Sequence, residues 1–236
     1  DESKQYLQNV AHQLTAPLGE IKWSIEGLTR PGGVSIEKRR RLLSSIYNQA
    51  TILVHLIKNF TLMSNLEVDH ELGQFREQPE RVNLLALTIN LAADFQPQAA
   101  ETNKTIEVDE ESFATALNGK DVKIIKNLIA QAISNILENA VKYADENTSI
   151  VISADANDTV ELFIESEGIP ISPEEKKNLF ERKYRGKSAK QNVPAGTGIG
   201  LYLVSKIMKI HRGNCIVETH NKKSSFILSF PLDSLA

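Results

Sequence analysis

Apolar residues in the first seventy positions recur at steps of three and four, which is the spacing of one face of a helix. A first helix is predicted to end near Leu28, because the run Arg30-Pro31-Gly32-Gly33 breaks the pattern. Ser35 then predicts an N-cap for a second helix, with Glu37 in its favourable first turn. The two apolar stripes consist of Leu7, Val10, Leu14, Leu18, Ile21, Ile25 and Leu28, and of Leu43, Ile46, Ala50, Leu53, Ile57 and Phe60.

Two helices joined by a short loop pack as an antiparallel hairpin. One hairpin has only two apolar stripes and cannot bury both of them alone. Pairing with a second copy would form a four-helix bundle, so this part of the chain predicts a homodimer.

Beyond Pro79, helical and strand patterns alternate. Helices are predicted over Val82–Ala100, Lys126–Tyr143 and Gly200–Arg212, the last followed by Gly213 as its C′ glycine. Strands are predicted over Thr105–Val108, Ser149–Ala154, Val160–Ser166, Cys215–His220 and Phe226–Phe230.

We therefore predict an α+β protein with two domains. Residues 1–70 form the helical hairpin that dimerises into a four-helix bundle. Residues 80–236 form an α/β two-layer sandwich, with helices over one sheet face and the polar segment Lys183–Gly198 looping out.

Composition narrows the class of protein. Of 236 residues, 41% are hydrophobic and 24% charged, which excludes wholesale disorder. The net charge of −3 gives no electrostatic reason to expect nucleic acid, and no apolar stretch is long enough for a membrane helix. Cys215 is the single cysteine, and no Cys/His spacing resembles a zinc site. Without an initiator Met or signal peptide, the chain is expected to be a cytosol-compatible piece of a longer polypeptide.

Four short patterns carry candidate chemistry, and the first surrounds His12. With Leu14 and Ile21 at heptad position a, His12 falls at f, facing away from the apolar seam. A neutral imidazole there can act as a nucleophile, and Pro17 is predicted to kink the helix one turn later. Taken alone, an ordinary surface histidine is the commoner interpretation.

The second pattern runs from Asn135 to Tyr143. On a helix, Asn135, Asn139 and Lys142 share one face, so two amides and an ammonium project together. An amide oxygen can ligate Mg²⁺ and a lysine can balance phosphate charge, although a polar outer face is the simpler alternative.

The third and fourth patterns lie later in the chain. The run from Gly196 to Leu201 precedes a helix, where glycines let backbone N–H groups approach a phosphate. The cations of Leu179–Gly186 could face phosphates or only solvate a loop.

In this order the patterns resemble the core of a sensor histidine kinase of two-component systems, over nearly the whole chain. The resemblance implies a phosphotransfer hairpin and then an ATP-binding domain of the fold shared with gyrase, Hsp90 and MutL. It implies that His12 is the phosphoacceptor, with Gln13 where a proton acceptor usually stands, and that Asn139 ligates Mg²⁺. The other ATP contacts that it implies are Asn135, Lys142, Tyr143, Ser166, Gly168, Arg185, Gly196, Gly198, Gly200 and Leu201.

The expected partner is the receiver domain of a response regulator, and the expected location is the cytoplasm, alone or as part of a membrane-anchored parent. Four residues depart from the family pattern. Gln13 replaces a Glu or Asp, and Ala16 replaces a Thr or Asn that helps to position water. In the first glycine box, Ser166 replaces the aspartate that accepts a hydrogen bond from the adenine amino group, and Pro170 replaces a glycine.

Two functions from different classes follow. The first is an active kinase that phosphorylates itself and a response-regulator aspartate; the second is a degenerate kinase that serves as a dimeric scaffold. The helical hairpin and His12 disfavour a third, a gyrase-like or chaperone ATPase. We favour the active kinase, because losing one buried hydrogen bond costs only about 1–3 kcal/mol and need not abolish binding.

Overall fold

The computed structural model describes residues 2–31, 33–72, 78–192 and 198–235 of the chain. The chain divides into two compact units, the first ending at Ser64 and the second beginning at Asn65. Each unit is described by itself.

The first unit is built on a helical hairpin, as the sequence predicts. Helix α1 spans Glu2–Leu28 and helix α2 spans Ile36–Leu72, so the second helix continues into the second unit. The backbone N–H of Lys38 donates to Ser35 Oγ at 3.3 Å, which confirms the predicted N-cap. Between the helices, the hydroxyl groups of Ser24 and Ser45 lie 3.4 Å apart.

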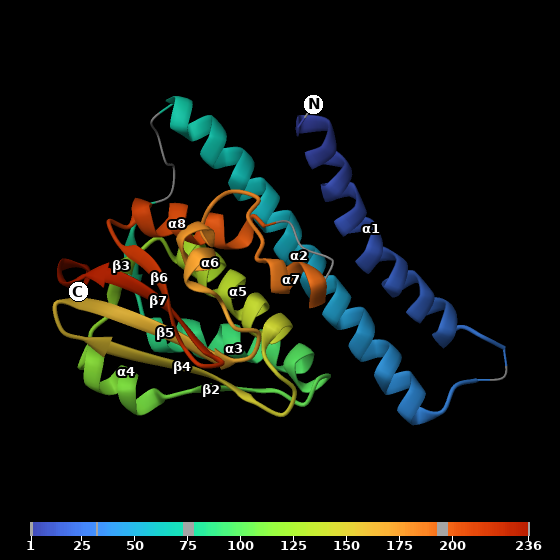
Figure 1. Ribbon diagram of the computed structural model, residues 1–236. Helices are drawn as coiled ribbons and strands as arrows, with labels where there is room; N and C mark the ends of the chain where they lie inside the picture. Colours follow the sequence, from blue (N-terminus) through green and yellow to red (C-terminus); the bar gives the residue numbers. More distant parts are fainter. Residues whose placement is uncertain (1, 32, 73–77, 193–197, 236) are drawn as a thin grey trace. The chain divides into compact units, whose positions relative to one another are not determined.

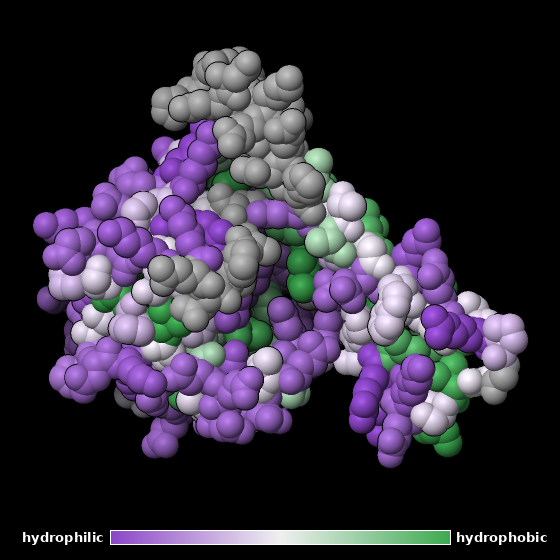
Figure 2. All heavy atoms as spheres, turned by 45° about the vertical axis from the view of Figure 1, so that its right-hand side comes forward, coloured by the Kyte–Doolittle hydropathy of each residue, from purple (hydrophilic) through white to green (hydrophobic). Residues whose placement is uncertain are grey.

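The hairpin exposes a regular apolar stripe on α2. Leu43, Tyr47, Val54 and Ile57 are each about half exposed, and they follow one another at steps of four, seven and three residues, which keeps them on one face of the helix. Figure 2 shows apolar side chains in green on the surface of the hairpin, among polar ones. A single copy therefore leaves one apolar face of the hairpin uncovered.

The second unit contains a five-stranded sheet in the order β2-β4-β5-β7-β6 (Figure 1). Strands β2 and β4 are parallel, and every other neighbouring pair is antiparallel. The strands are β2 Thr105–Val108, β4 Ser149–Ala156, β5 Thr159–Glu167, β6 Asn214–His220 and β7 Lys223–Pro231. A separate antiparallel pair joins β1 Glu80–Val82 to β3 Val122–Ile124.

Helices pack on one face of this sheet (Figure 1). Helix α5 (Lys126–Tyr143) lies between α3 (Leu84–Ala100) and α8 (Gly200–Ile210), and all three contact strands. Alternate residues of β5, such as Leu162 and Ile164, are fully buried beneath them. The remaining short helices are α4 Glu110–Leu117, α6 Pro173–Asn178, α7 Lys187–Asn192 and the 3₁₀ turn Leu232–Ser234. The predicted α+β class and the order of hairpin followed by sandwich are confirmed.

A hydrogen bond to a side chain determines where helix α3 begins. Asn83 Oδ1 accepts the N–H of Ala86 at 2.8 Å, so α3 begins at Leu84. The prediction that this helix starts at Val82 is wrong, because Val82 pairs with Val122 in the small sheet. Tertiary strand pairing overrides the helical pattern at that position.

The predicted end of the last long helix also needs correction. Helix α8 ends at Ile210, and the left-handed residue that follows is Arg212, with φ 55°, rather than Gly213. Gly213 is required for a different reason: a Cβ atom there would overlap the carbonyl oxygen of Ser229. The glycine marks close backbone contact with β7.

The polar segment Lys183–Gly198 is less open than predicted, since α7 occupies Lys187–Asn192 within it. Residues 193–197, including Gly196, lie outside the described residues. Among the helices described, none combines the length and the apolar character needed to cross a membrane.

Candidate nucleotide site

Asn135, Asn139 and Lys142, which the sequence predicts to share one face of a helix, lie on one face of α5. Asn135 is buried at 2% exposure, while Asn139 and Lys142 are half-buried. The opposite side of the helix packs in the core through Ile133, Ile136, Leu137 and Val141, which fixes the direction of the polar face. Glu138 lies on the same polar face, three residues after Asn135 and four before Lys142.

Charges of both signs meet at this face. Burial raises the pKa of Glu138 above its ordinary value, and Lys142 opposes that rise. Burial lowers the pKa of Lys142, Glu138 raises it, and the positive charge of Arg185 lowers it further. Two cations and one carboxyl group therefore influence one another here, and an added phosphate would relieve the repulsion between the cations.

The start of α8 lies against this face. A Cβ atom at Gly200 would stand 3.4 Å from the amide oxygen of Asn135, so the first residue of α8 is a neighbour of the buried asparagine. Leu201 follows it in the first turn and is half-buried. The N-terminus of an eleven-residue helix, where the first N–H groups have no acceptor within the helix itself, is thus close to Asn135.

Gly198 connects this helix start to the segment that contains Arg185. Its φ is +67°, a left-handed conformation, and a Cβ atom would lie 2.8 Å from backbone atoms of Lys183 and Tyr184. The N–H of Lys183 donates to the carbonyl of Gly198 at 3.0 Å. Two predicted motifs, distant in the sequence, are therefore in direct backbone contact.

The end of α5 meets the end of β5. The N–H of Ile169 donates to the carbonyl of Tyr143 at 3.2 Å, and the N–H of Asp145 donates to the carbonyl of Glu167 at 2.8 Å. A Cβ atom at Gly168 would overlap the Tyr143 carbonyl, so glycine is required at this crossing. Tyr143 is half-buried, and the Lys142 ammonium lies 5.7 Å from the centre of its ring.

Ser166 belongs to a row of hydroxyl groups. It pairs directly with Ser224 on β7, which in turn pairs with Thr219 on β6. Each of the three is an even number of positions from the buried residues of its own strand. Their side chains therefore lie on the helix-covered face.

The neighbouring carboxylates do not replace the missing aspartate. The β5–β7 register runs without interruption from Thr159 to Glu167, so no bulge turns a neighbour inward. Glu165 lies on the opposite face and pairs with Lys223 at 3.0 Å. The helix-covered face carries only neutral hydroxyls at these three paired positions.

His12 and Gln13 lie on α1, in the first unit. The side chain of His12 lies outside the described residues, whereas Gln13 is half-buried and Ala16 is exposed. Thr15 Oγ1 donates to the carbonyl of Ala11 at 2.7 Å, and α1 runs on through Pro17.

Two residues of the site, Glu138 and Ser224, are not among those predicted from the sequence. Glu138 could have been found from its spacing to Asn135 and Lys142, which places it on their face of the helix. Ser224 could not, because its proximity to Ser166 depends on the strand register.

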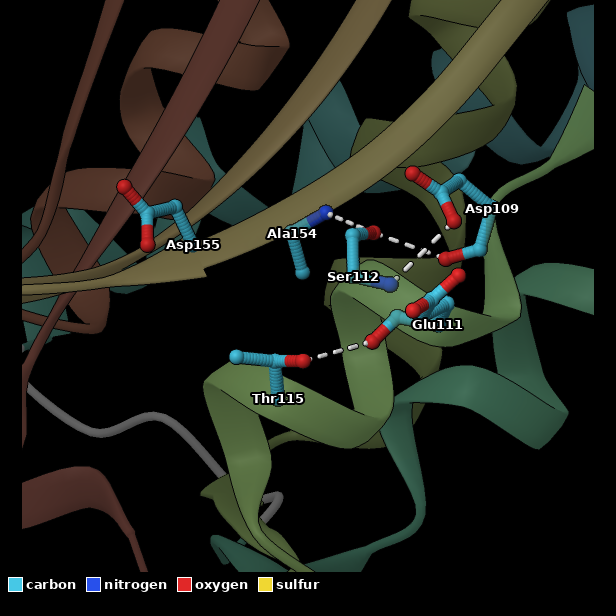
Figure 3. Close-up of a pocket in the computed structure, with 6 residues that line it drawn as sticks. All are labelled: Asp109, Glu111, Ser112, Thr115, Ala154 and Asp155. Atoms are coloured by element: carbon cyan, nitrogen blue, oxygen red, sulfur yellow. Dashed lines mark hydrogen bonds between the residues drawn. The ribbon is translucent and has the colours of Figure 1, made fainter.

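A separate hollow lies between α4 and β4 and is lined by Asp109, Glu111, Ser112, Thr115, Ala154 and Asp155 (Figure 3). Asp109 accepts the N–H of Ser112 at 3.2 Å as the helix cap, and the Ser112 hydroxyl accepts the N–H of Ala154 at 3.0 Å. These bonds fasten α4 to β4. Across the described parts of the chain, no group of three or more His, Cys, Asp or Glu side chains is arranged to hold a metal ion.

Comparison with known proteins agrees with this geometry. Residues 125–234 match the family described as "Histidine kinase-, DNA gyrase B-, and HSP90-like ATPase". The match covers α5, the sheet strands β4 to β7 and α8, which carry the polar residues and the helix start described above. These residues therefore form an ATP-binding domain of that type.

Relatives extend the similarity into the hairpin. Histidine protein kinase SaeS of Staphylococcus epidermidis is 29% identical over 87% of this chain. Sensor histidine kinase WalK of Bacillus subtilis is 25% identical over 96%. The chain spans 56% of the length of SaeS and 36% of that of WalK.

Solved structures share the fold. The catalytic domain of histidine kinase ThkA has a TM-score of 0.54 and 26% identity, covering 65% of this chain and 95% of that chain. Acinetobacter baumannii histidine kinase AdeS has a TM-score of 0.60 and 22% identity, covering 94% of this chain and 98% of its own. The chain is therefore similar in sequence to histidine kinases along most of its length, and similar in fold to solved histidine kinase structures.

Proposed function

We propose that this chain is the core of an ATP-dependent protein-histidine kinase. The observation that carries the proposal is the contact between Gly200, at the start of α8, and Asn135, on the polar face of α5. It brings a helix N-terminus next to the amides and the lysine that suit a triphosphate. SaeS and WalK, which this chain matches over 87% and 96% of its length, are named histidine kinases.

The nucleotide contacts follow from the positions of the side chains. Lys142 and Arg185 would balance phosphate charge, and Tyr143 would flank the base. The N–H groups at the start of α8, next to Gly198 and Gly200, would contact the phosphates.

Asn139 would hold Mg²⁺ through its amide oxygen. Mg²⁺ keeps several waters and is commonly bound through one or two protein oxygens together with substrate phosphates. A half-buried amide on the phosphate-binding face fits this requirement, and the ion would neutralise charge on the phosphates.

The reaction transfers the γ-phosphoryl group to the imidazole of His12. A P–N bond forms, the bond from the γ-phosphorus to the β–γ bridging oxygen breaks, and ADP leaves. The imidazole proton passes to solvent, since the amide of Gln13 can orient the ring but is not basic. Phosphoryl transfer depends mainly on positioning and charge stabilisation, so Gln13 slows the step without preventing it.

The phosphoryl group would then pass from His12 to an aspartate in the receiver domain of a response regulator, breaking the P–N bond and forming an acyl phosphate. We infer that two copies of the hairpin associate through the exposed stripe on α2, and that the core works in the cytoplasm. Incubation with γ-labelled ATP tests the kinase. Mg²⁺-dependent label that is acid-labile and base-stable supports it, and the absence of such label contradicts it.

A further inference from the structure

Lys104, at the entrance to β2, is a lysine with only 5% of its surface exposed. Asn103 before it has a left-handed φ of 52°, and the Lys104 N–H donates to the carbonyl of Ala99 at 3.0 Å. This turn directs the side chain inward, where Nζ donates to the carbonyl of Val141 at 2.7 Å. A buried ammonium is costly unless it is hydrogen-bonded, so the bond accounts for its position.

Val141 lies in the last turn of α5, where carbonyl groups have no partner within the helix. The carbonyl of Ala140 accepts the N–H of Ala144 at 2.9 Å, and that of Tyr143 accepts the N–H of Ile169 at 3.2 Å. Val141 accepts from the Lys104 side chain instead. That bond is charge-assisted, which makes it roughly twice as strong as a neutral one.

The surroundings keep this ammonium in place. A positive charge at a helix C-terminus is favourable because it complements the helix dipole. Burial lowers the pKa of Lys104, while the carboxylates of Glu146 and then Asp145 raise it. Asp145 itself pairs with Lys222 at 3.1 Å, so the helix end is also joined to the turn between β6 and β7.

We propose that Lys104 is a positioning residue of the nucleotide site: it fixes the last turn of α5 and, through it, Lys142 and Tyr143. These two residues directly follow Val141, so an opening of the turn would displace both. Lys104 lies before residues 125–234, which match the ATPase family. The residue that holds the last turn of α5 therefore lies outside the matched segment. The proposal rests on the proposed function, because it requires a nucleotide at this face of α5.

The test compares three variants of the intact chain. Lys104→Met removes the charge at similar length, and Lys104→Arg keeps a charged donor. Lys120→Met is the control, because Lys120 is exposed. Amide exchange without nucleotide is followed by mass spectrometry in peptides from the end of α5 and from α8.

We expect roughly tenfold faster exchange at the end of α5 in Lys104→Met, with α8 unchanged, and substantial recovery in Lys104→Arg. Calorimetry with Mg²⁺-ATP, well below the unfolding temperature, should show roughly tenfold weaker binding for Lys104→Met alone. A lysine that only stabilised the fold would raise exchange throughout the unit and leave the affinity unchanged.

Unchanged exchange at the end of α5, or local opening with full ATP affinity, would overturn the positioning role while the parent still binds ATP. A parent chain that binds no ATP would overturn the proposed function itself, and the positioning role with it. ATP binding by the parent chain therefore distinguishes a failure of the positioning role from a failure of the proposed function.

Discussion

Ser166 on β5 and Ser224 on β7 are direct cross-strand partners whose side chains lie on the helix-covered face of the sheet. The family pattern places an aspartate at position 166, where its carboxylate accepts a hydrogen bond from the adenine amino group. A hydroxyl pair is neutral and can donate as well as accept. This relationship predicts weak nucleotide binding with little preference for adenine.

Replacing Ser166 by Asp should tighten ATP binding by about 1–2 kcal/mol and create a preference for ATP over GTP. Calorimetry with both nucleotides measures the effect. Ser153→Asp is the matched control. By strand alternation, Ser153 lies on the opposite face of the sheet, so this variant should leave both affinities unchanged. Low-micromolar binding of ATP by the parent, with rejection of GTP, would show that another acceptor reads the base.

Gly198 and Gly200 predict contrasting alanine variants. Gly198→Ala combines a left-handed φ with overlap of the backbone at Lys183, so it should cost about 1–2 kcal/mol and weaken nucleotide binding. Gly200→Ala meets Asn135 at an ordinary contact distance and should change the free energy of unfolding by less than about 0.5 kcal/mol. Denaturant unfolding of the two variants checks this order, and equal losses would contradict it.

The apolar stripe on α2 predicts a dimer. Val54 is 50% exposed, and burying a side chain of this kind contributes about 1.5–3 kcal/mol. Val54→Asp should therefore dissociate the protein at micromolar concentration. Arg41→Asp should not, because Arg41 is exposed and lies two residues before Leu43, off the face that carries the stripe. Light scattering distinguishes the species. A monomeric parent with a folded hairpin would refute the dimer.

His211 predicts a loss of stability towards acid pH. Its Nε2 accepts the N–H of Ile125 at 2.9 Å, while its Nδ1 donates to the carbonyl of Ile207 at 2.8 Å, so the bonds require the neutral ring. Burial lowers the pKa of His211 below its ordinary value of 6.5.

Because the unfolded chain takes up this proton first, the contribution of His211 is complete above pH 6.5 and declines as the pH falls below it. Denaturant unfolding at several pH values between 7.5 and 5 should show this decline in the parent. It should be smaller in His211→Gln, and identical pH dependence in the two proteins would contradict the assignment.

Much of the fold follows from local patterns that the structure retains. The helix predicted at approximately Lys126–Tyr143 coincides with α5, because one long face is apolar and the other polar. Short elements such as β1 and α4 are not predicted, because three to eight residues carry too little periodicity and tertiary pairing decides them. Arg212 in place of Gly213 shows the same limit, since a close approach to Ser229 determines where the glycine is needed.

The candidate site likewise contains residues that local spacing predicts and contacts that only the fold creates. Asn135, Asn139 and Lys142 are predicted together because helical spacing alone unites them. The contact of Gly200 with Asn135, and that of Lys104 with Val141, join segments 65 and 37 residues apart, so only the fold reveals them. The roles of these residues in binding ATP remain predictions.

The most direct test of the kinase is the fate of the γ-phosphoryl group in the parent and in His12→Gln. Both proteins are incubated with γ-labelled Mg²⁺-ATP, and their nucleotide affinities are measured in parallel. The parent should acquire acid-labile, base-stable label, and the variant should acquire none while binding ATP equally well. Equal labelling of the two proteins would contradict the assignment of His12 as the phosphoacceptor.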